Sequence, residues 1–225
     1  MSKHLNIAID GPAGAGKSTA AKKIAEKLKI HYLDTGAMYR ALGLYVLEKG
    51  VSPADEAAVS RILNEADIVV RYDDGGAQRV LIAGQDVTDR IRTPEVSMAA
   101  STVSAYPPVR DKLSSLQRAV GECYDVVMDG RDITTNVLPH TKHKFYVTAS
   151  SAERARRRCL ELQAKGMAAD YEAVLADIEK RDLQDTTRDY KPLQIAPDAV
   201  IVDTTALSIE EVTDLMLLAI REKEA

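Results

Sequence analysis

Hydrophobic and polar positions near the start of the chain predict a strand, a turn and a helix. Residues 5–9 form an apolar-rich run that is typical of a short buried strand. Beyond a glycine-rich turn, Ala20, Ile24 and Leu28 recur every four residues, which places them on one helical face. A second helix is expected at about 37–48. Together these segments predict the first half of a βαβ unit.

The pattern changes between about residues 62 and 90. Ile68, Val70 and Tyr72 alternate with their neighbours, residues 73–76 carry the turn sequence Asp-Asp-Gly-Gly, and an apolar run returns at 80–82. Alternation with a period of two on both sides of a glycine turn predicts a hairpin. We therefore expect a small antiparallel β insertion at about 62–90.

Several short motifs predict where helices begin. Ser52-Pro53 and Thr93-Pro94 each combine an N-cap residue with proline at the first helical position. Two capping boxes are also present, Ser150 with Glu153 and Ser208 with Glu211.

The second half of the chain returns to strands that alternate with helices. Buried strands are expected at 126–128, 145–147 and 200–202. The helices are expected at about 151–164, 170–184 and 208–222. Strands interleaved with helices predict a parallel sheet covered on both faces. The fold class is therefore α/β, a three-layer α/β/α sandwich.

Composition narrows the possible functions. The 225 residues are 45% hydrophobic and 28% charged, which suits one globular domain. A net charge of −4 argues against a general nucleic-acid-binding surface. No stretch approaches the ~18 apolar residues of a membrane span, and no signal peptide is evident. We expect a cytoplasmic monomer without nucleic-acid or membrane partners. Cys123 and Cys159 lack metal-ligand spacing and are expected to be reduced and packed.

The glycine-rich turn carries the strongest motif. Residues 11–18 match G-x-x-x-x-G-K-[ST], between the predicted strand and helix. Such a loop turns backbone N–H groups toward phosphate, and the helix dipole adds to the attraction. Lys17 is expected to reach the β- and γ-phosphates, and Ser18 to ligate Mg²⁺ together with phosphates and waters. The predicted ATP-binding residues are Gly11, Pro12, Ala13, Gly14, Ala15, Gly16, Lys17, Ser18 and Thr19. The alternative, a glycine turn with a chance lysine, does not account for this context.

A phosphate loop alone does not identify a substrate. The N-K-x-D motif of GTPases is absent from the sequence. Residues 31–40 supply a second candidate, because a short strand is followed by a helix that carries Tyr39 and Arg40 in its first turns. An arginine there is suited to grip a phosphate with two hydrogen bonds, although a solvent-facing arginine is the alternative.

Other candidate residues come from the second half of the chain. Asp129 ends the strand at 126–128, where a carboxylate reaches the ligand crevice of a parallel sheet. There it would hold Mg²⁺ water or orient arginine side chains. The alternative is a structural aspartate that marks the end of the strand. Most arginines of 154–158 are expected to form a solvated charged face. Arg181, Asp185 and Arg188 share one face if their helix continues that far.

Several motifs then make the chain resemble the bacterial type of cytidylate kinase, a P-loop nucleoside monophosphate kinase. The resemblance runs in order through nearly the whole chain. It is carried by G-P-A-G-A-G-K-S-T, Y-L-D-T-G-A-M-Y-R, Arg92-Thr93-Pro94-Glu95-Val96, Ala99-Ala100-Ser101, Val109-Arg110, Asp129-Gly130-Arg131-Asp132-Ile133 and Asp203-Thr204-Thr205.

The resemblance implies one P-loop kinase domain over 1–225 with three regions. The core would comprise 1–35, 105–150 and 198–225, and a helical lid would span about 151–190. The nucleoside monophosphate-binding region, with its β insertion, would span about 36–104.

The resemblance also implies which residues form the site. Arg40, Arg131 and Arg188 would bind the acceptor phosphate, while Lys17, Arg131, Arg181 and Arg188 would act in catalysis. The full predicted CMP-binding set is Thr35, Tyr39, Arg40, Ser101, Arg110, Asp129, Arg131, Asp132, Asp185 and Arg188. Asp132 and Ser101 are suited to accept from the amino group of cytosine, and Arg110 to donate to its ring acceptors.

The expected reaction is ATP + CMP ⇌ ADP + CDP, with dCMP also accepted, UMP accepted poorly and Mg²⁺ as cofactor. Three positions depart from the family pattern. Thr134 stands where glycine is usual, Thr35 where serine is common, and Lys191 in a segment that is commonly Ala-Pro-Leu. A kinase for UMP, AMP or shikimate, a nucleotide-binding regulator without turnover and a nucleic-acid-binding ATPase remain the alternatives.

Overall fold

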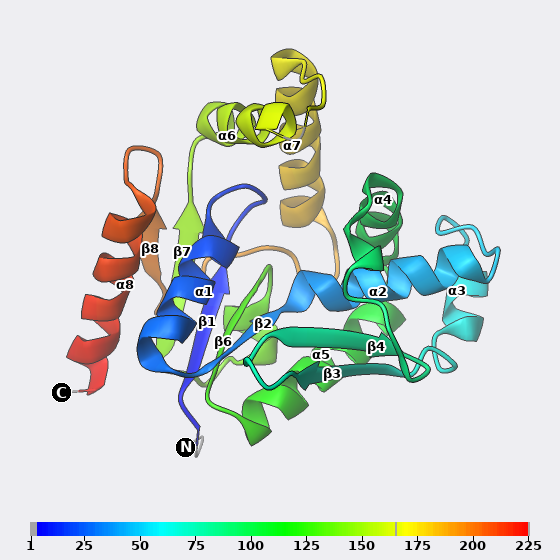
Figure 1. Ribbon diagram of the computed structural model, residues 1–225, viewed down its shortest axis with the longest axis horizontal. Coiled ribbons are helices and arrows are strands. Elements are labelled where there is room, and N and C mark those ends of the chain that lie inside the picture. The colour runs from blue at the N-terminus through cyan, green and yellow to red at the C-terminus, as the bar shows by residue number, and fades with distance from the viewer. Residues whose placement is uncertain (1–3, 165, 225) are drawn as a thin grey trace.

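The computed structural model describes residues 4–164 and 166–224 and has an α/β architecture (Figure 1). Its main sheet is parallel throughout, with the order β2-β6-β1-β7-β8. The strands in that order are β2 (His31–Asp34), β6 (Val126–Gly130), β1 (Asn6–Asp10), β7 (His143–Thr148) and β8 (Val200–Asp203). All five residues of β1 are buried, as expected for a central strand covered on both faces.

Helices cover both faces of this sheet, which confirms the predicted three layers. Ile7 and Ile9 of β1 face one cluster, which includes α1 (Lys17–Leu28) and α8 (Ile209–Glu224). Ala8 faces the other cluster, together with α2 (Thr35–Glu48) and α5 (Pro107–Cys123). The alternation follows from the pleat of a strand, which sends successive side chains to opposite faces.

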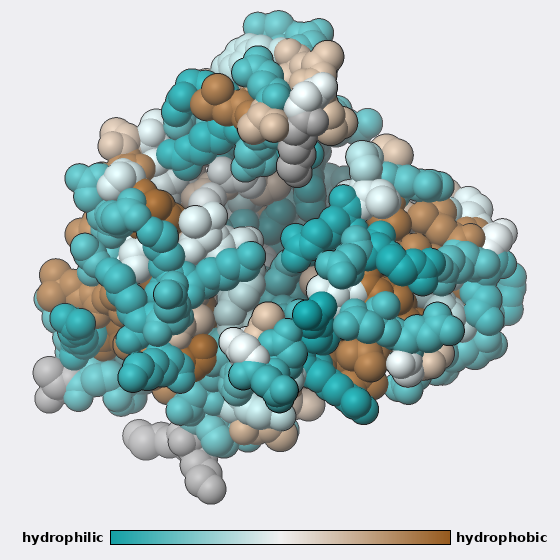
Figure 2. All heavy atoms as spheres, viewed as in Figure 1, coloured by the Kyte–Doolittle hydropathy of each residue, from teal (hydrophilic) through white to brown (hydrophobic). Residues whose placement is uncertain are grey.

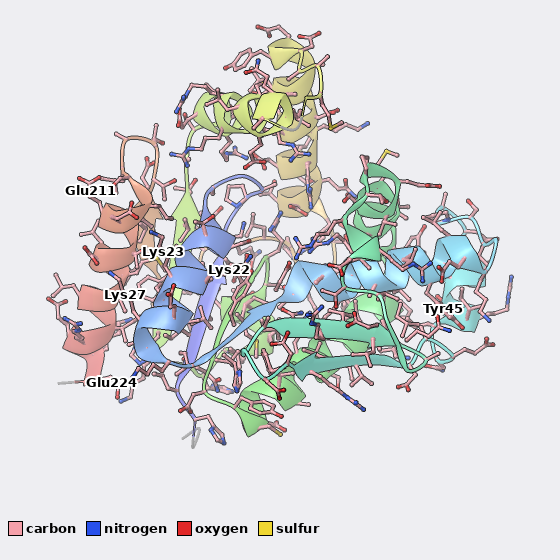
Figure 3. All side chains as sticks on the ribbon, viewed as in Figure 1. Lys22, Lys23, Lys27, Tyr45, Glu211 and Glu224 are labelled. Atoms are coloured by element: carbon pink, nitrogen blue, oxygen red, sulfur yellow. The ribbon has the colours of Figure 1, made fainter. Side chains whose placement is uncertain are left out.

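Ion pairs add to the apolar contact between α1 and α8. Lys23 and Lys27 project from α1 toward α8 (Figure 3). Lys23 pairs with Glu210, and Lys27 Nζ lies 2.7 Å from an oxygen of Asp214. Both pairs are exposed, so most of the stabilisation at this contact comes from the apolar residues beneath them.

The predicted β insertion is present as a separate sheet of order β3-β4-β5. Its strands are β3 (Ile68–Tyr72), β4 (Gln78–Ile82) and β5 (Gln85–Asp86), and each neighbouring pair is antiparallel. The elements beside it are α3 (Glu56–Ile62), η1 (Arg90–Arg92) and α4 (Pro94–Val103). At Gly43 of α2 an added Cβ would lie 2.8 Å from the Ala100 backbone nitrogen, so glycine permits the close approach of α2 and α4.

The α6–α7 arm, formed by α6 (Ser151–Ala164) and α7 (Tyr171–Thr187), stands apart from the sheet (Figure 1). No residue of α7 is buried. The remaining element is a π-helical turn, η2 (Ile133–Val137), which follows β6. Within the described residues, no helix has the length and apolar character needed to cross a membrane.

The helix-start predictions have mixed outcomes. Thr93 caps α4 with Pro94 at the first position, as predicted. The prediction at Ser52-Pro53 is wrong, because those residues form a turn and α3 begins three residues later, where the Asp55 carboxylate accepts from the Ala58 N–H at 2.9 Å.

The capping boxes also differ from each other. Ser208 and Glu211 form both reciprocal hydrogen bonds. Ser150 caps the Glu153 N–H at 3.2 Å, but the Glu153 carboxylate binds Arg156 and Arg157 instead of reaching back. Charge-assisted bonds to arginine are stronger than a bond to a backbone N–H.

Both cysteines are free, as expected. Cys159 is buried in α6, in agreement with a packing role. Cys123 is exposed, contrary to the prediction, because it lies at the C-terminal end of α5 where the helix leaves the core.

Candidate active site

The phosphate loop links β1 to α1 at the carboxyl edge of the sheet. Gly16, the residue before α1, has φ 86°, and no side chain caps the first turn of the helix. At Gly11 an added Cβ would lie 1.9 Å from the Val147 carbonyl oxygen, so a side chain there would collide with β7. The free N–H groups at the start of α1 therefore face an open loop, and this arrangement binds anions.

Lys17 is buried at the base of this loop, with 6% of its surface exposed. Its Nζ donates to the Pro12 carbonyl at 2.6 Å. Burial, together with the positive charge of Arg131, lowers the pKa of Lys17 to about 7. An arriving phosphate would reverse that shift, because an anion favours the ammonium form.

Ser18 contacts Asp129, and this pair offers oxygen ligands to a cation. The Ser18 hydroxyl donates to Asp129 Oδ2 at 2.7 Å, and the Tyr32 hydroxyl donates to Oδ1 at 2.8 Å. Burial, and then the charge of Asp34, raise the pKa of Asp129. A hard cation would relieve this crowded negative charge, so the residues fit Mg²⁺. No group of three or more His, Cys, Asp or Glu side chains suited to a metal occurs in the described ranges, so phosphates and waters would supply most ligands.

We name the space beside the phosphate loop the inner cleft, with a volume of about 240 Å³. Every residue assigned to the acceptor side from sequence lines it. These are Thr35, Tyr39, Arg40, Ser101, Arg110, Asp129, Arg131, Asp132, Asp185 and Arg188. Figure 2 shows the surface hollowed between the α6–α7 arm and the part that carries α2 and α4. The structure thus brings together residues from α2, α4, α5, β6 and α7.

A buried ion pair lines the inner cleft. Arg110 Nη2 lies 2.6 Å from Asp132 Oδ1, and only 2% of the Arg110 side chain is exposed. Asn136 donates to the other Asp132 oxygen at 3.0 Å. Arg110 Nε and the Tyr39 hydroxyl have no hydrogen-bond partner within the described residues, although both are buried. Unpartnered buried donors beside an open cleft indicate a polar ligand.

The lining of the inner cleft is also rich in arginines. Arg131 Nε lies 2.6 Å from Asp185 Oδ2, and Arg188 Nη1 lies 3.5 Å from Asp185 Oδ1. Arg40 pairs with Asp34 at 2.7 Å. Desolvation and the charge of Arg131 lower the pKa of Arg181, although its side chain keeps contact with solvent. These cations crowd one another, so an anion between them is favoured.

The helix that carries Arg181 ends at Thr187, so it does not reach Arg188. Arg188 is the extended C-cap residue, and its Nε donates to the Lys191 carbonyl at 2.8 Å. The three residues Arg181, Asp185 and Arg188 still line one cleft, because the turn after α7 directs Arg188 back toward Asp185.

Thr35 and Ser101 occupy different environments in the cleft wall. The Thr35 hydroxyl donates to the Asp129 carbonyl at 2.6 Å, so its proton is already engaged. The Ser101 carbonyl accepts from the Ser104 hydroxyl, and Ser101 lies on α4 facing the cleft. Within the described residues the Asp129 carboxylate accepts from Ser18 and Tyr32 and forms no hydrogen bond or ion pair with an arginine, so the prediction that it orients arginine side chains stays a prediction.

A second space, the outer cleft, lies on the other side of the phosphate loop and has a volume of about 960 Å³. Its walls are the start of α1, the α6 arginines and residues 204–209. Arg157 donates to the Thr204 carbonyl at 2.6 Å. Gly14, Lys17 and Ser18 line both clefts.

Arg154 corrects the expectation of a solvated arginine face. Only 4% of its surface is exposed. Its guanidinium binds the Asp182 carboxylate at 3.0 and 2.5 Å and the Ala13 carbonyl at 3.1 Å. Arg156 and Arg158 are exposed, as predicted. Helical spacing within α6 could not reveal Arg154, because its partner lies on another helix.

Asp10 is a further residue that sequence reasoning missed. Fully buried before the phosphate loop, it accepts from the N–H groups of Ile133 and Thr134 at 2.9 and 2.7 Å and from the Thr134 hydroxyl at 2.6 Å. Burial raises its pKa to about 6. The Thr134 hydroxyl therefore adds a hydrogen bond that a glycine at this position would lack. The only signal in the sequence was an acidic residue at a strand end.

The sequence of this chain is similar to known proteins over nearly its whole length. A family model described as cytidylate kinase matches residues 7–222. A cytidylate kinase of Caldicellulosiruptor bescii is 51% identical over 215 residues, 96% of this chain and 95% of that protein. One from Carboxydothermus hydrogenoformans is 51% identical over 219 residues, 97% of this chain and 98% of that protein. The match to a solved shikimate kinase from Bacteroides thetaiotaomicron covers 96% of this chain and 98% of that chain, with 16% identity and a TM-score of 0.47.

Proposed function

The chain belongs to the cytidylate kinase family, and we propose from that premise that it transfers the γ-phosphoryl group of ATP to CMP. The products are ADP and CDP. We include dCMP among the acceptors and expect UMP to be a poor one. The observation that carries the proposal is the inner cleft, which is lined by the phosphate loop, by a group of arginines and by the buried Arg110–Asp132 pair.

The phosphate loop and Lys17 are proposed to bind the triphosphate of the donor. The uncapped start of α1 and the glycine conformations support this role. Lys17 lies where the two clefts meet, so its ammonium is suited to hold the phosphoryl group that passes between them. The outer cleft, bounded by Arg157 and Thr204, is proposed to receive the rest of the donor nucleotide.

We propose that Ser18 contributes a ligand to Mg²⁺, with Asp129 close behind it. When bound, Mg²⁺ would neutralise charge on the donor phosphates. Asp129 orients the Ser18 hydroxyl through their 2.7 Å hydrogen bond, and Tyr32 fixes the second oxygen of Asp129. The protein thus presents prealigned oxygen atoms at the end of the phosphate loop.

The base of the acceptor is proposed to bind at the Arg110–Asp132 end of the cleft. Asp132 is suited to accept from the cytosine amino group, assisted by Ser101, while Arg110 donates to the ring acceptors. Uracil has an oxygen where cytosine has its amino group, so the Asp132 carboxylate would repel it. A polar site that leaves buried groups unpaired with the wrong base discriminates by up to ~10⁴-fold.

Arg40, Arg131 and Arg188 are proposed to bind the acceptor phosphate, with Asp185 holding two of them in place. An oxygen of that phosphate then forms the new bond to the γ-phosphorus, and the bond to the β-phosphate oxygen breaks. The attacking oxygen is already anionic near neutral pH, so no general base is needed. Positioning and charge neutralisation by Lys17, Arg131, Arg181 and Arg188 lower the barrier.

We propose that the α6–α7 arm is the lid of a single domain over residues 1–225. The core of that domain would comprise 1–35, 105–150 and 198–225, and the acceptor-binding region would span about 36–104. The absence of buried residues in α7 supports motion of this arm, because few apolar contacts hold it against the rest of the protein. Closure would bring Arg181 over the phosphates and exclude water.

An acceptor panel tests the proposal. ATP and Mg²⁺ are supplied with CMP, dCMP, UMP, AMP or shikimate, and ADP release is followed in a coupled assay. We expect turnover with CMP and dCMP, a much lower rate with UMP, and none after chelation of Mg²⁺. Turnover confined to another acceptor would overturn the base assignment, and ATP binding without any transfer would indicate a regulator instead.

A further inference from the structure

The edge of the main sheet carries an unusual contact with the β insertion. β2 is the outermost strand beside β6, so no strand among the described residues pairs with its other edge. At Asp34, the last residue of β2, the side-chain amide of Gln78 takes the place of a strand partner. The Asp34 N–H donates to Gln78 Oε1 at 2.7 Å, and Gln78 Nε2 donates to the Asp34 carbonyl at 3.2 Å.

The side chain of Asp34 extends this contact into the inner cleft. Its Oδ1 accepts from the Ala37 N–H at 3.0 Å and thereby caps α2. Its Oδ2 accepts from Arg40 Nη2 at 2.7 Å. Space around this group is tight, because a Cβ at Gly36 would lie 3.1 Å from both the Arg40 guanidinium and the Asp34 carboxylate. Arg40 therefore has little freedom to move independently of Asp34.

The other attachment of the insertion to β2 lies at the opposite end of that strand. The Tyr72 ring of β3 stacks on the His31 ring with centroids 4.0 Å apart. That contact is a ring stack at the first residue of β2, and it does not involve Asp34. Of these two attachments, only the one at Gln78 joins the insertion to the residue that holds Arg40.

We propose that Gln78 is a positioning residue for the acceptor phosphate, acting through Asp34 and Arg40. The inference rests on the proposed function, in which Arg40 binds that phosphate. A side chain from the insertion thus sets the phosphate end of the acceptor site, whereas the Arg110–Asp132 pair sets the base end. Loss of both Gln78 hydrogen bonds would leave the Asp34 backbone unpaired and release Arg40.

The test compares CMP with cytidine, which lacks the phosphate, by calorimetric titration of the full chain. Q78M fills a similar volume but makes neither hydrogen bond. We expect Q78M to weaken CMP binding about tenfold, the scale of losing a hydrogen bond that supports a charged group, and to leave cytidine binding unchanged. Gln85, an exposed residue of the same small sheet, provides the control Q85M, for which both affinities should be unchanged.

A double-mutant cycle with R40A separates the two hypotheses. In the R40A background, Q78M should cause no further loss of CMP affinity. If R40A leaves the ratio of CMP to cytidine affinity unchanged, the proposed role of Arg40 fails. If R40A lowers that ratio but Q78M does not, the role of Gln78 is overturned while the proposed function stands. The same conclusion follows if the losses of CMP affinity caused by R40A and Q78M add in the double variant. Each ratio is measured within one variant, so a modest loss of stability does not affect it.

Discussion

At the scale of single residues, Lys17 combines burial with a position between two clefts. Its replacement by alanine removes the ammonium without altering the backbone of the phosphate loop. We expect K17A to lower kcat by at least ~10²-fold, the scale of losing one preorganised charge donor. The coupled assay measures this, with a thermal melt to verify folding. A variant within about threefold of the parent would contradict the role of Lys17.

Asp132 has both a structural and a selective role in the proposed site. Because Arg110 is buried against it, D132N would leave a buried guanidinium without its counter-charge. We expect a loss of ~3–5 kcal/mol in the free energy of unfolding, as for other broken buried pairs. Urea denaturation measures the loss, with D74N in the exposed hairpin turn as control.

The same D132N variant is expected to lower the ratio of CMP to UMP turnover. An amide both donates and accepts, so it no longer repels the oxygen of uracil. An unchanged ratio in a folded variant would remove Asp132 from base recognition.

At the scale of elements, the crossing of α2 and α4 fixes the width of the acceptor site. Arg40 and Ser101 lie on these two helices, and Gly43 allows their backbones to meet. A Cβ at Gly43 would approach the Ala100 nitrogen to 2.8 Å and the Val96 oxygen to 3.1 Å. G43A should therefore separate the helices, lower stability by ~1–3 kcal/mol, as overpacking does, and raise KM for CMP more than KM for ATP.

A matched control for G43A is G75A, because a Cβ at Gly75 meets only Asp73 Oδ1 at an ordinary 3.4 Å. Denaturant midpoints and initial rates with both substrates provide the measurements. Equal changes in the two KM values would mean that the crossing does not set the acceptor site specifically.

The helices and strands were the features that the sequence predicted best. Hydrophobic periodicity placed the phosphate-loop strand and helix, the antiparallel insertion and the later alternation, because each pattern arises within a single segment. The start of α3 differs from the prediction because both Ser52 and Asp55 are capable caps. The Asp55 carboxylate caps the helix through the Ala58 N–H, whereas the Ser52 hydroxyl accepts from the Ala54 N–H in the preceding turn. The roles of Arg154 and Gln78 were not predictable from local pattern, because their partners lie far away in the chain.

At the scale of the whole molecule, charge is unevenly distributed. The chain carries a net charge of −4, yet Lys17, Arg131, Arg181 and Arg188 converge on one cleft. Burial, followed by the positive charges of Arg131 and Arg181, lowers the pKa of Lys17 to about 7 in the free protein. Binding of a polyphosphate restores the charged form, so the protein should take up close to one proton per ATP at pH 8 and much less at pH 6.

Titration calorimetry in two buffers of different ionisation enthalpy measures this proton uptake. K17R is the matched control, because arginine remains charged throughout this range and should take up none. An uptake that is equal in the parent and in K17R would assign the proton to another group.

The wall shared by the inner and outer clefts has a consequence for inhibitor design. Gly14, Lys17 and Ser18 line both spaces, so a molecule in one and a molecule in the other would contact the same three residues. A bisubstrate compound, with adenosine and cytidine joined through a polyphosphate tether, could occupy both spaces at once. Such a compound would gain from effective concentration, since docking of either nucleoside brings the second within reach of its own half of the site.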